Sequence, residues 1–136
     1  MAARALPAAQ PFGERFSLER PLDGPHLSFD LPAEADRLRR ERPWEDGGHN
    51  AITLAKYADL RLVLTVLRAG MHMLTHEPDE RLAVQVISGR LRVRTSHQLI
   101  DLPPGHLLAL DRSMAHEVEA VEDAAFLLTI TRHARA

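Results

Sequence analysis

The chain has 136 residues, of which 45% are hydrophobic and 26% are charged, a size and balance typical of one globular domain. Its formal net charge of −2 predicts no general attraction to nucleic acid, and the absence of cysteine excludes disulfides, thiolate metal ligands and cysteine nucleophiles. No apolar run approaches the roughly 18–20 residues that cross a bilayer, and prolines interrupt the start of the chain. We therefore expect a soluble, cytoplasmic protein that contacts neither membrane nor nucleic acid.

Residues 1–25 predict a loose arm, because their four prolines each fix φ and lack a backbone donor. Residues 26–49 lead into the main domain. Their first six alternate in polarity, as in a short strand. Acids then precede arginines until Pro43, a distribution that complements the helix dipole, so we expect one short helix over residues 33–42. Trp44 is expected to pack this helix against the body.

From residue 50 to residue 131 the chain consists of short β-prone runs that are divided by turns. The expected strands span residues 51–55, 60–67, 71–75, 82–87, 91–95, 98–102, 107–110, 116–121 and 124–131. Short strands at such regular intervals, without helices between them, predict an all-β sandwich or barrel.

The turn before residue 116 carries a specific pattern. Gly105, Asp111, Ser113 and His116 have the spacing of the second sequence motif of the cupins, with Asp111 and Ser113 in the place of a proline and a glycine. Both substitutes are good turn formers, so the bend is expected to survive.

The first cupin motif runs from a glycine to a glycine, and Gly70 and Gly89 match its two ends. Residues 50–131 therefore resemble the cupins, and the segment before them resembles a group of small bacterial single-domain cupins with no settled role. The resemblance implies a double-stranded β-helix, that is, a jelly-roll barrel, preceded by one short N-terminal helix.

Members of this family usually hold a metal with three histidines and one glutamate, and the resemblance transfers that set only in part. The glutamate position, seven residues before Gly89, holds Leu82. The two earlier histidine positions fall near Thr75 and Glu77 or near His76 and Pro78, depending on the loop length. His116 matches the motif, and His76 matches under the second spacing.

We therefore predict a ligand or metal site in the barrel mouth around His76 and His116, with Glu80 as the third metal ligand. Glu77 and His72 are alternatives for that third place. An extended chain separates His72 from His76 by about 13–14 Å, too far to share one ion unless the chain bends. With Leu82 at the glutamate position, we expect no cofactor or a weakly bound divalent ion such as Zn, Ni, Fe or Mn.

Two further features of the strands remain open. Gln85 has the opposite parity to Leu82 and could contact a ligand or a subunit interface, although a satisfied polar strand residue is the commoner case. Arg90, Arg92 and Arg94 make one strand face basic, which favours cross-strand pairing with acids over binding of an anion.

The leading function is a small-molecule-binding barrel that is non-enzymatic or has a degenerate metal site. The alternatives are a metal-dependent enzyme of the dioxygenase or isomerase type, using His76, His116 and a loop carboxylate, and a ligand-sensing module. Such a module would act through a partner, because no room for a helix-turn-helix follows the barrel. Edge strands, together with Phe12, Phe16 and Phe29, predict a homodimer.

Overall fold

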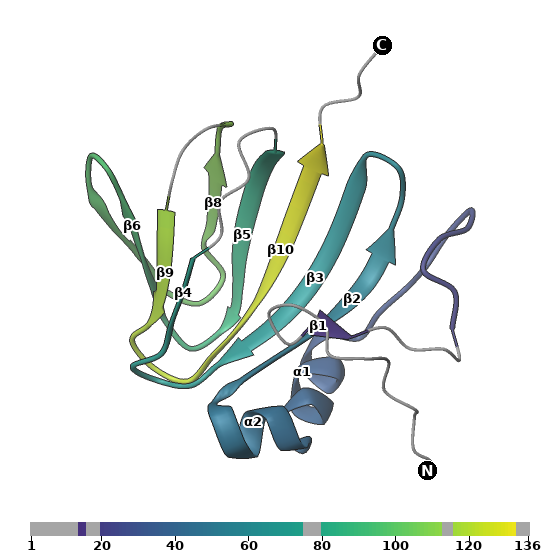
Figure 1. Cartoon of the computed structure of the whole chain (residues 1–136), viewed down its shortest axis with the longest axis horizontal. Coiled ribbons are helices and arrows are strands. Elements are labelled where there is room, and N and C mark those ends of the chain that lie inside the picture. The colour runs from purple at the N-terminus through teal and green to yellow at the C-terminus, as the bar shows by residue number, and fades with distance from the viewer. Residues whose placement is uncertain (1–13, 16–19, 75–79, 113–115, 133–136) are drawn as a thin grey trace.

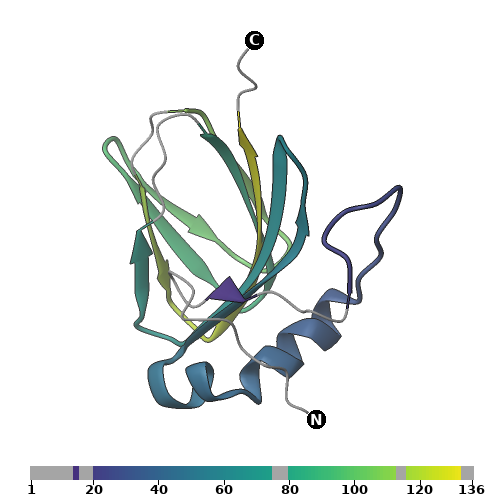
Figure 2. The same cartoon turned by 45° about the vertical axis from the view of Figure 1, so that its right-hand side comes forward.

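The chain folds into two β-sheets that face each other, with two short helices beside the larger sheet (Figures 1 and 2). This computed structural model describes residues 14–15, 20–74, 80–112 and 116–132. The six-stranded sheet has the order β1-β2-β3-β10-β5-β8, and the four-stranded sheet has the order β4-β9-β6-β7. The all-β prediction is therefore confirmed.

The strands lie close to their expected positions, and each pair of neighbours is antiparallel apart from β1 and β2. Their bounds are β1 (Glu14–Arg15), β2 (His49–Lys56), β3 (Leu60–Leu67), β4 (His72–Leu74), β5 (Glu80–Ser88), β6 (Leu91–Thr95), β7 (Leu99–Leu102), β8 (Leu107–Leu110), β9 (His116–Ala120) and β10 (Ala124–Arg132).

The helical part differs from the prediction of a single helix over residues 33–42. Helix α1 (Leu31–Arg39) begins at Asp30, whose carboxylate accepts a hydrogen bond from the backbone N–H of Ala33 at 3.1 Å. A second helix, α2 (Arg42–Gly47), follows directly. Pro43 lies in the first turn of α2 rather than closing a helix, because the first turn makes no use of the N–H that proline lacks.

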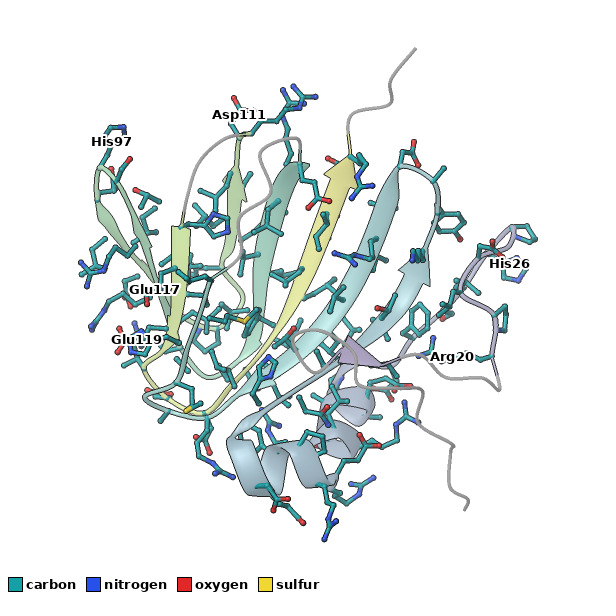
Figure 3. The ribbon with its side chains drawn as sticks, in the orientation of Figure 1. Arg20, His26, His97, Asp111, Glu117 and Glu119 are labelled. Atoms are coloured by element: carbon teal, nitrogen blue, oxygen red, sulfur yellow. The ribbon has the colours of Figure 1, made fainter. Side chains whose placement is uncertain are left out.

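The segment before α1 also differs from the prediction. Residues 26–30 form no strand, and Asp30 acts as the helix cap instead. The described part of the arm is not loose. Strand β1 pairs with β2, and the backbone N–H of Lys56 donates to the carbonyl of Leu22 at 2.7 Å. The arm therefore follows the free edge of β2, where Figure 3 shows Arg20.

Two apolar cores result from the alternation of side chains along the strands. The larger core lies between the two sheets and includes Val84, Val93, Val118 and Phe126, which are fully buried. The second core lies between α1 and the outer face of the large sheet, where Trp44 packs as expected. Strands β2 and β3 are consequently largely buried on both faces, whereas the end of the large sheet at β8 has only its inner face covered.

No helix among the described residues is long and apolar enough to span a bilayer.

Candidate functional site

His116 is buried on the inner face of the small sheet. Strand β9 alternates, so that His116, Val118 and Ala120 face the large sheet, and only 8% of the His116 surface is exposed. Its cross-strand neighbour on β6 is Thr95. A buried imidazole can donate from one ring nitrogen and accept at the other, which makes it a good anchor for a polar group of a ligand.

Two threonines add polar atoms to the same interior. Thr53 and Thr65 are buried on β2 and β3, and the strand register places Thr65 opposite Phe126 of the larger core. Their hydroxyl groups can donate and accept, and the surrounding interior is aliphatic or aromatic. The sequence did not single out these threonines, because a lone threonine in an apolar run is commonly a strand former.

Leu82 lies within the larger core, with 9% of its surface exposed. It is in register with Ile130 of β10 and with Leu110 of β8, so its flanking positions on the inner face are apolar. The strand position that would offer a carboxylate in the family pattern therefore offers only a hydrocarbon side chain.

His72 does not face the interior, and its candidacy as an interior metal ligand is wrong. On β4, Met73 packs against the larger core, whereas His72 is exposed on the opposite face. Its Nδ1 lies 3.2 Å from the carboxylate of Glu117. Because successive residues of a strand point to opposite faces, the burial of Met73 forces His72 outward.

Glu80 shares the inner face with Leu82, but its carboxylate is already engaged. Arg132, directly opposite on β10, donates to it from Nη2 at 3.0 Å. A metal would have to compete with this ion pair for the carboxylate. Glu80 is thus placed near the expected site but bound to a cation of the protein itself.

Gln85 is exposed on the outer face of β5, between Leu127 and Leu107 of the neighbouring strands. It therefore cannot contact a ligand inside the barrel, and that part of the prediction is wrong. His76 and Glu77 lie outside the described residues.

The described residues do not fit the metal that this fold family commonly holds. Within the described ranges, no group of three or more His, Asp or Glu side chains is arranged to hold an ion. Among the described candidate ligands, His116 faces the interior, whereas the carboxylate of Glu80 is bound to Arg132. Leu82, at the glutamate position of the family pattern, supplies no donor.

The basic strand face is paired, as the sequence favoured. Arg92 and Arg94 of β6 lie 3.8 Å from Glu119 and Glu117 of β9, respectively. Figure 3 shows both glutamates on the small sheet. Arg90 binds Asp101 at 2.6 Å. These exposed pairs belong to the outer face and contribute nothing to the interior.

One end of the inner face carries charged residues that the sequence did not single out. The register places Arg61, Ile130 and Leu82 in one line across β3, β10 and β5. Because Ile130 and Leu82 face the larger core, Arg61 shares that face. Lys56 lies opposite Arg61 on β2. The polarity pattern of β3 could not show that Arg61 faces inward, because most residues on both faces of this strand are apolar and buried.

Solved structures share this architecture, although the identities are low. A cupin-2 domain protein from Shewanella frigidimarina superposes with a TM-score of 0.62 and 15% identity, covering 76% of this chain and 94% of its own. An RmlC-like cupin from Desulfovibrio desulfuricans superposes with a TM-score of 0.63 and 20% identity, and the match covers 78% of this chain and 97% of that protein. A salicylate 1,2-dioxygenase variant from Pseudoaminobacter salicylatoxidans superposes with a TM-score of 0.66 and 18% identity, and the match covers 76% of this chain and 34% of that protein.

No protein-family model and no curated protein sequence matches this chain. The structural likenesses, at identities of 15–20% for the three structures above, establish the fold alone.

Proposed function

We propose that this protein, which has the cupin fold, binds a small organic molecule between its two sheets, beside His116, and holds no tightly bound catalytic metal. The observation that carries the proposal is Leu82, which lies in the apolar core at the position where the family pattern has a carboxylate ligand. Without that carboxylate the interior loses both a negative charge and an oxygen donor, so its affinity for a divalent ion falls.

The chemistry of the interior supports an organic ligand. Small-molecule sites are mostly apolar and contain a few convergent polar groups. Here the polar groups are His116, Thr53 and Thr65, and the apolar surroundings include Leu82 and Phe126. A ligand of this kind would bury its hydrocarbon part against the aliphatic side chains and direct a polar group to the imidazole.

Metal content is the first test. Protein purified without chelator is expected to hold clearly less than one ion per chain, measured by elemental mass spectrometry. Leu82→Glu, which returns a carboxylate to the interior, is expected to raise the Zn or Fe content. Ala83→Glu is the matched control, because its side chain lies on the other face of the same strand. Stoichiometric Fe or Mn in the wild type, lost in His116→Ala, would instead favour a metal-dependent enzyme.

Ligand binding is the second test. A panel of small organic compounds is screened for saturable increases in the melting temperature, and hits are repeated with His116→Ala. His97→Ala serves as the control, because His97 lies at the tip of the β6–β7 hairpin (Figure 3). Binding that is lost in His116→Ala and kept in His97→Ala supports the proposal. Binding that is unchanged in both would place the ligand elsewhere.

A further inference from the structure

We propose that residues 20–24 form a releasable strap that closes the edge of β2 against a second copy of this chain. When the strap detaches, the uncovered edge pairs with the same edge of another chain. The strap acts at the end of the large sheet opposite to β8, and its release is independent of the proposed ligand binding between the sheets.

The strap occupies backbone groups on the open side of β2. Strand β1 pairs with β2 only at residues 51–52. Farther along β2, the backbone N–H of Lys56 donates to the carbonyl of Leu22 at 2.7 Å. The Nη1 of Arg20 donates to the carbonyl of Leu54 at 3.1 Å. These are groups that a neighbouring strand would otherwise use, so the strap takes the place of a strand.

Leu54 depends on a donor from outside the β2–β3 pair because it lies in a β-bulge. The register shifts between Thr53 and Ala55, and Leu54 between them has no register partner on β3. Leu54 is also buried, and a buried carbonyl without a donor costs free energy. The guanidinium of Arg20 therefore supplies the hydrogen bond that the bulge leaves open.

Arg20 is the main attachment of the strap. Its guanidinium carbon lies 5.1 Å from the centroid of the Phe29 ring, and Phe29 packs against the second core. Burial lowers the pKa of Arg20, and the negative charge of Glu34 on α1 partly offsets this effect. A cation–π contact and a charge-assisted hydrogen bond thus hold one side chain between β2 and the segment that leads into α1 (Figure 3).

The rest of the strap is attached weakly. The hydroxyl of Tyr57 donates to the carbonyl of Gly24 at 3.0 Å, at an exposed position. Three of the five strap residues are exposed. Among the described residues, neither apolar core includes one that precedes Phe29. The strap can therefore detach without uncovering either core, and Arg20 controls its release.

The edge that the strap covers is suited to strand pairing. Residues 50–55 of β2 are uncharged, include neither proline nor glycine, and are buried on both faces. Segments of this kind pair readily with other strands once their edge is open, and native proteins commonly cover such edges. A second copy is the partner that fits, because two β2 edges offer each other the same segment around a two-fold axis.

Hydrogen exchange at two neighbouring amides tests the strap. The N–H of Lys56 is bonded to the strap, whereas the N–H of Tyr57 donates to the carbonyl of Leu60 at 2.8 Å within the β2–β3 hairpin. Exchange is followed by NMR in dilute full-length protein, for wild type, Arg20→Gln and Tyr57→Phe. The mass of each protein is then measured by light scattering as its concentration is raised.

Arg39→Gln is the matched control. The guanidinium carbon of Arg39 lies 5.7 Å from the centroid of the Trp44 ring, so this variant removes a similar cation–π contact at the end of α1. Its exchange rates and its mass are expected to equal those of wild type.

Arg20→Gln is expected to speed exchange of the Lys56 amide at least about tenfold, as for the loss of one charge-assisted hydrogen bond, and to leave the amide of residue 57 unchanged. As the concentration rises, its mass should exceed that of wild type, and its Lys56 amide should become protected again. Tyr57→Phe should show the same effects more weakly, with exchange about threefold faster. If Arg20→Gln does not fold, Tyr57→Phe decides the question.

Three results would overturn the proposal. An unchanged Lys56 amide in Arg20→Gln would show that Arg20 does not hold the strap. Equal acceleration at Lys56 and Tyr57 would show that the strap and the hairpin open together. Faster exchange at Lys56 without any rise in mass would show that the uncovered edge does not pair with a second copy.

Discussion

Glu80 and Arg132 lie directly opposite each other on β5 and β10 and form an ion pair of 3.0 Å at one end of the inner sheet face. The glutamate side chain is largely shielded, whereas the arginine is 66% exposed. Water therefore screens the ion pair from one side. The chief effect of the pair is that Arg132 binds a carboxylate that faces the interior.

We expect this pair to contribute little to stability. A double-mutant cycle with Glu80→Gln and Arg132→Gln should give a coupling free energy below about 1 kcal/mol, as for other exposed ion pairs. The coupling should shrink at high salt, because screening weakens exposed charges. Urea unfolding at two salt concentrations measures it. A coupling free energy of several kcal/mol that does not change with salt concentration would show instead that the pair is shielded from water and stabilises the fold.

Gly89 is required by the turn between β5 and β6. Its φ is +78°, and a Cβ placed there would lie 2.1 Å from the backbone oxygen of Asp123. Gly89→Ala should therefore lower the free energy of unfolding by about 2–5 kcal/mol, the sum of the left-handed backbone cost and forced displacement of the neighbouring backbone.

Gly105 provides the matched control for Gly89. Its φ is +84°, but a Cβ there would meet no atom within 4 Å. Gly105→Ala should thus cost only the backbone part, about 1–2 kcal/mol. Thermal or urea unfolding of both variants checks the difference. Equal losses would mean that the space around Gly89 opens without cost.

His49 makes stability depend on pH. Burial lowers the pKa of His49 below its ordinary value of 6.5. Between the two pKa values the unfolded chain binds more protons than the folded chain, so the free energy of unfolding rises with pH in that window. The contribution is complete above about pH 6.5 and is lost as the pH falls from there toward the folded pKa.

The variant His49→Gln should flatten this part of the pH profile, because glutamine does not titrate. His97→Gln is the control for the substitution itself, because His97 lies at an exposed turn. Urea unfolding between about pH 8 and about pH 5 provides the comparison. If the free energy of unfolding changed with pH in the same way for wild type and His49→Gln, the pH dependence would not come from His49.

A homodimer remains our proposal, and the structure suggests a different contact from the one first expected. Phe29 packs against the second core of its own chain, and Phe12 and Phe16 lie outside the described residues. The outer face at β8 offers Leu107, which is 64% exposed, beside the exposed Gln85. An uncovered apolar side chain on an edge strand favours pairing with a second copy.

Light scattering is expected to give twice the mass of one chain for wild type at micromolar concentration, and a lower mass for Leu107→Lys. Leu99→Lys is the control, since Leu99 is half-exposed on β7, an edge strand of the other sheet. A wild-type mass of one chain would refute the dimer, and a loss of dimer in Leu99→Lys alone would move the interface to the small sheet.

The sequence by itself determined the strands from β2 to β10 and the turns between them. Strands such as β3 and β6 were placed at their observed bounds, because alternation and turn residues act over a few neighbouring positions. Gly89 and Gly105 were identified from motif spacing, and both have the positive φ that excludes most other residues. The inward direction of His116 likewise follows from a local pattern, since its neighbours Val118 and Ala120 share its parity.

Where the pattern of a strand is ambiguous, only the tertiary structure decided which face is inside. Strand β3 is apolar on both faces because α1 covers the outer one, so its pattern could not show that Arg61 faces inward. The outward directions of His72 and Gln85, and the capture of Glu80 by Arg132, likewise depend on strand pairs far apart in the chain. Parity fixes which residues share a face, whereas packing against distant elements determines which face is buried.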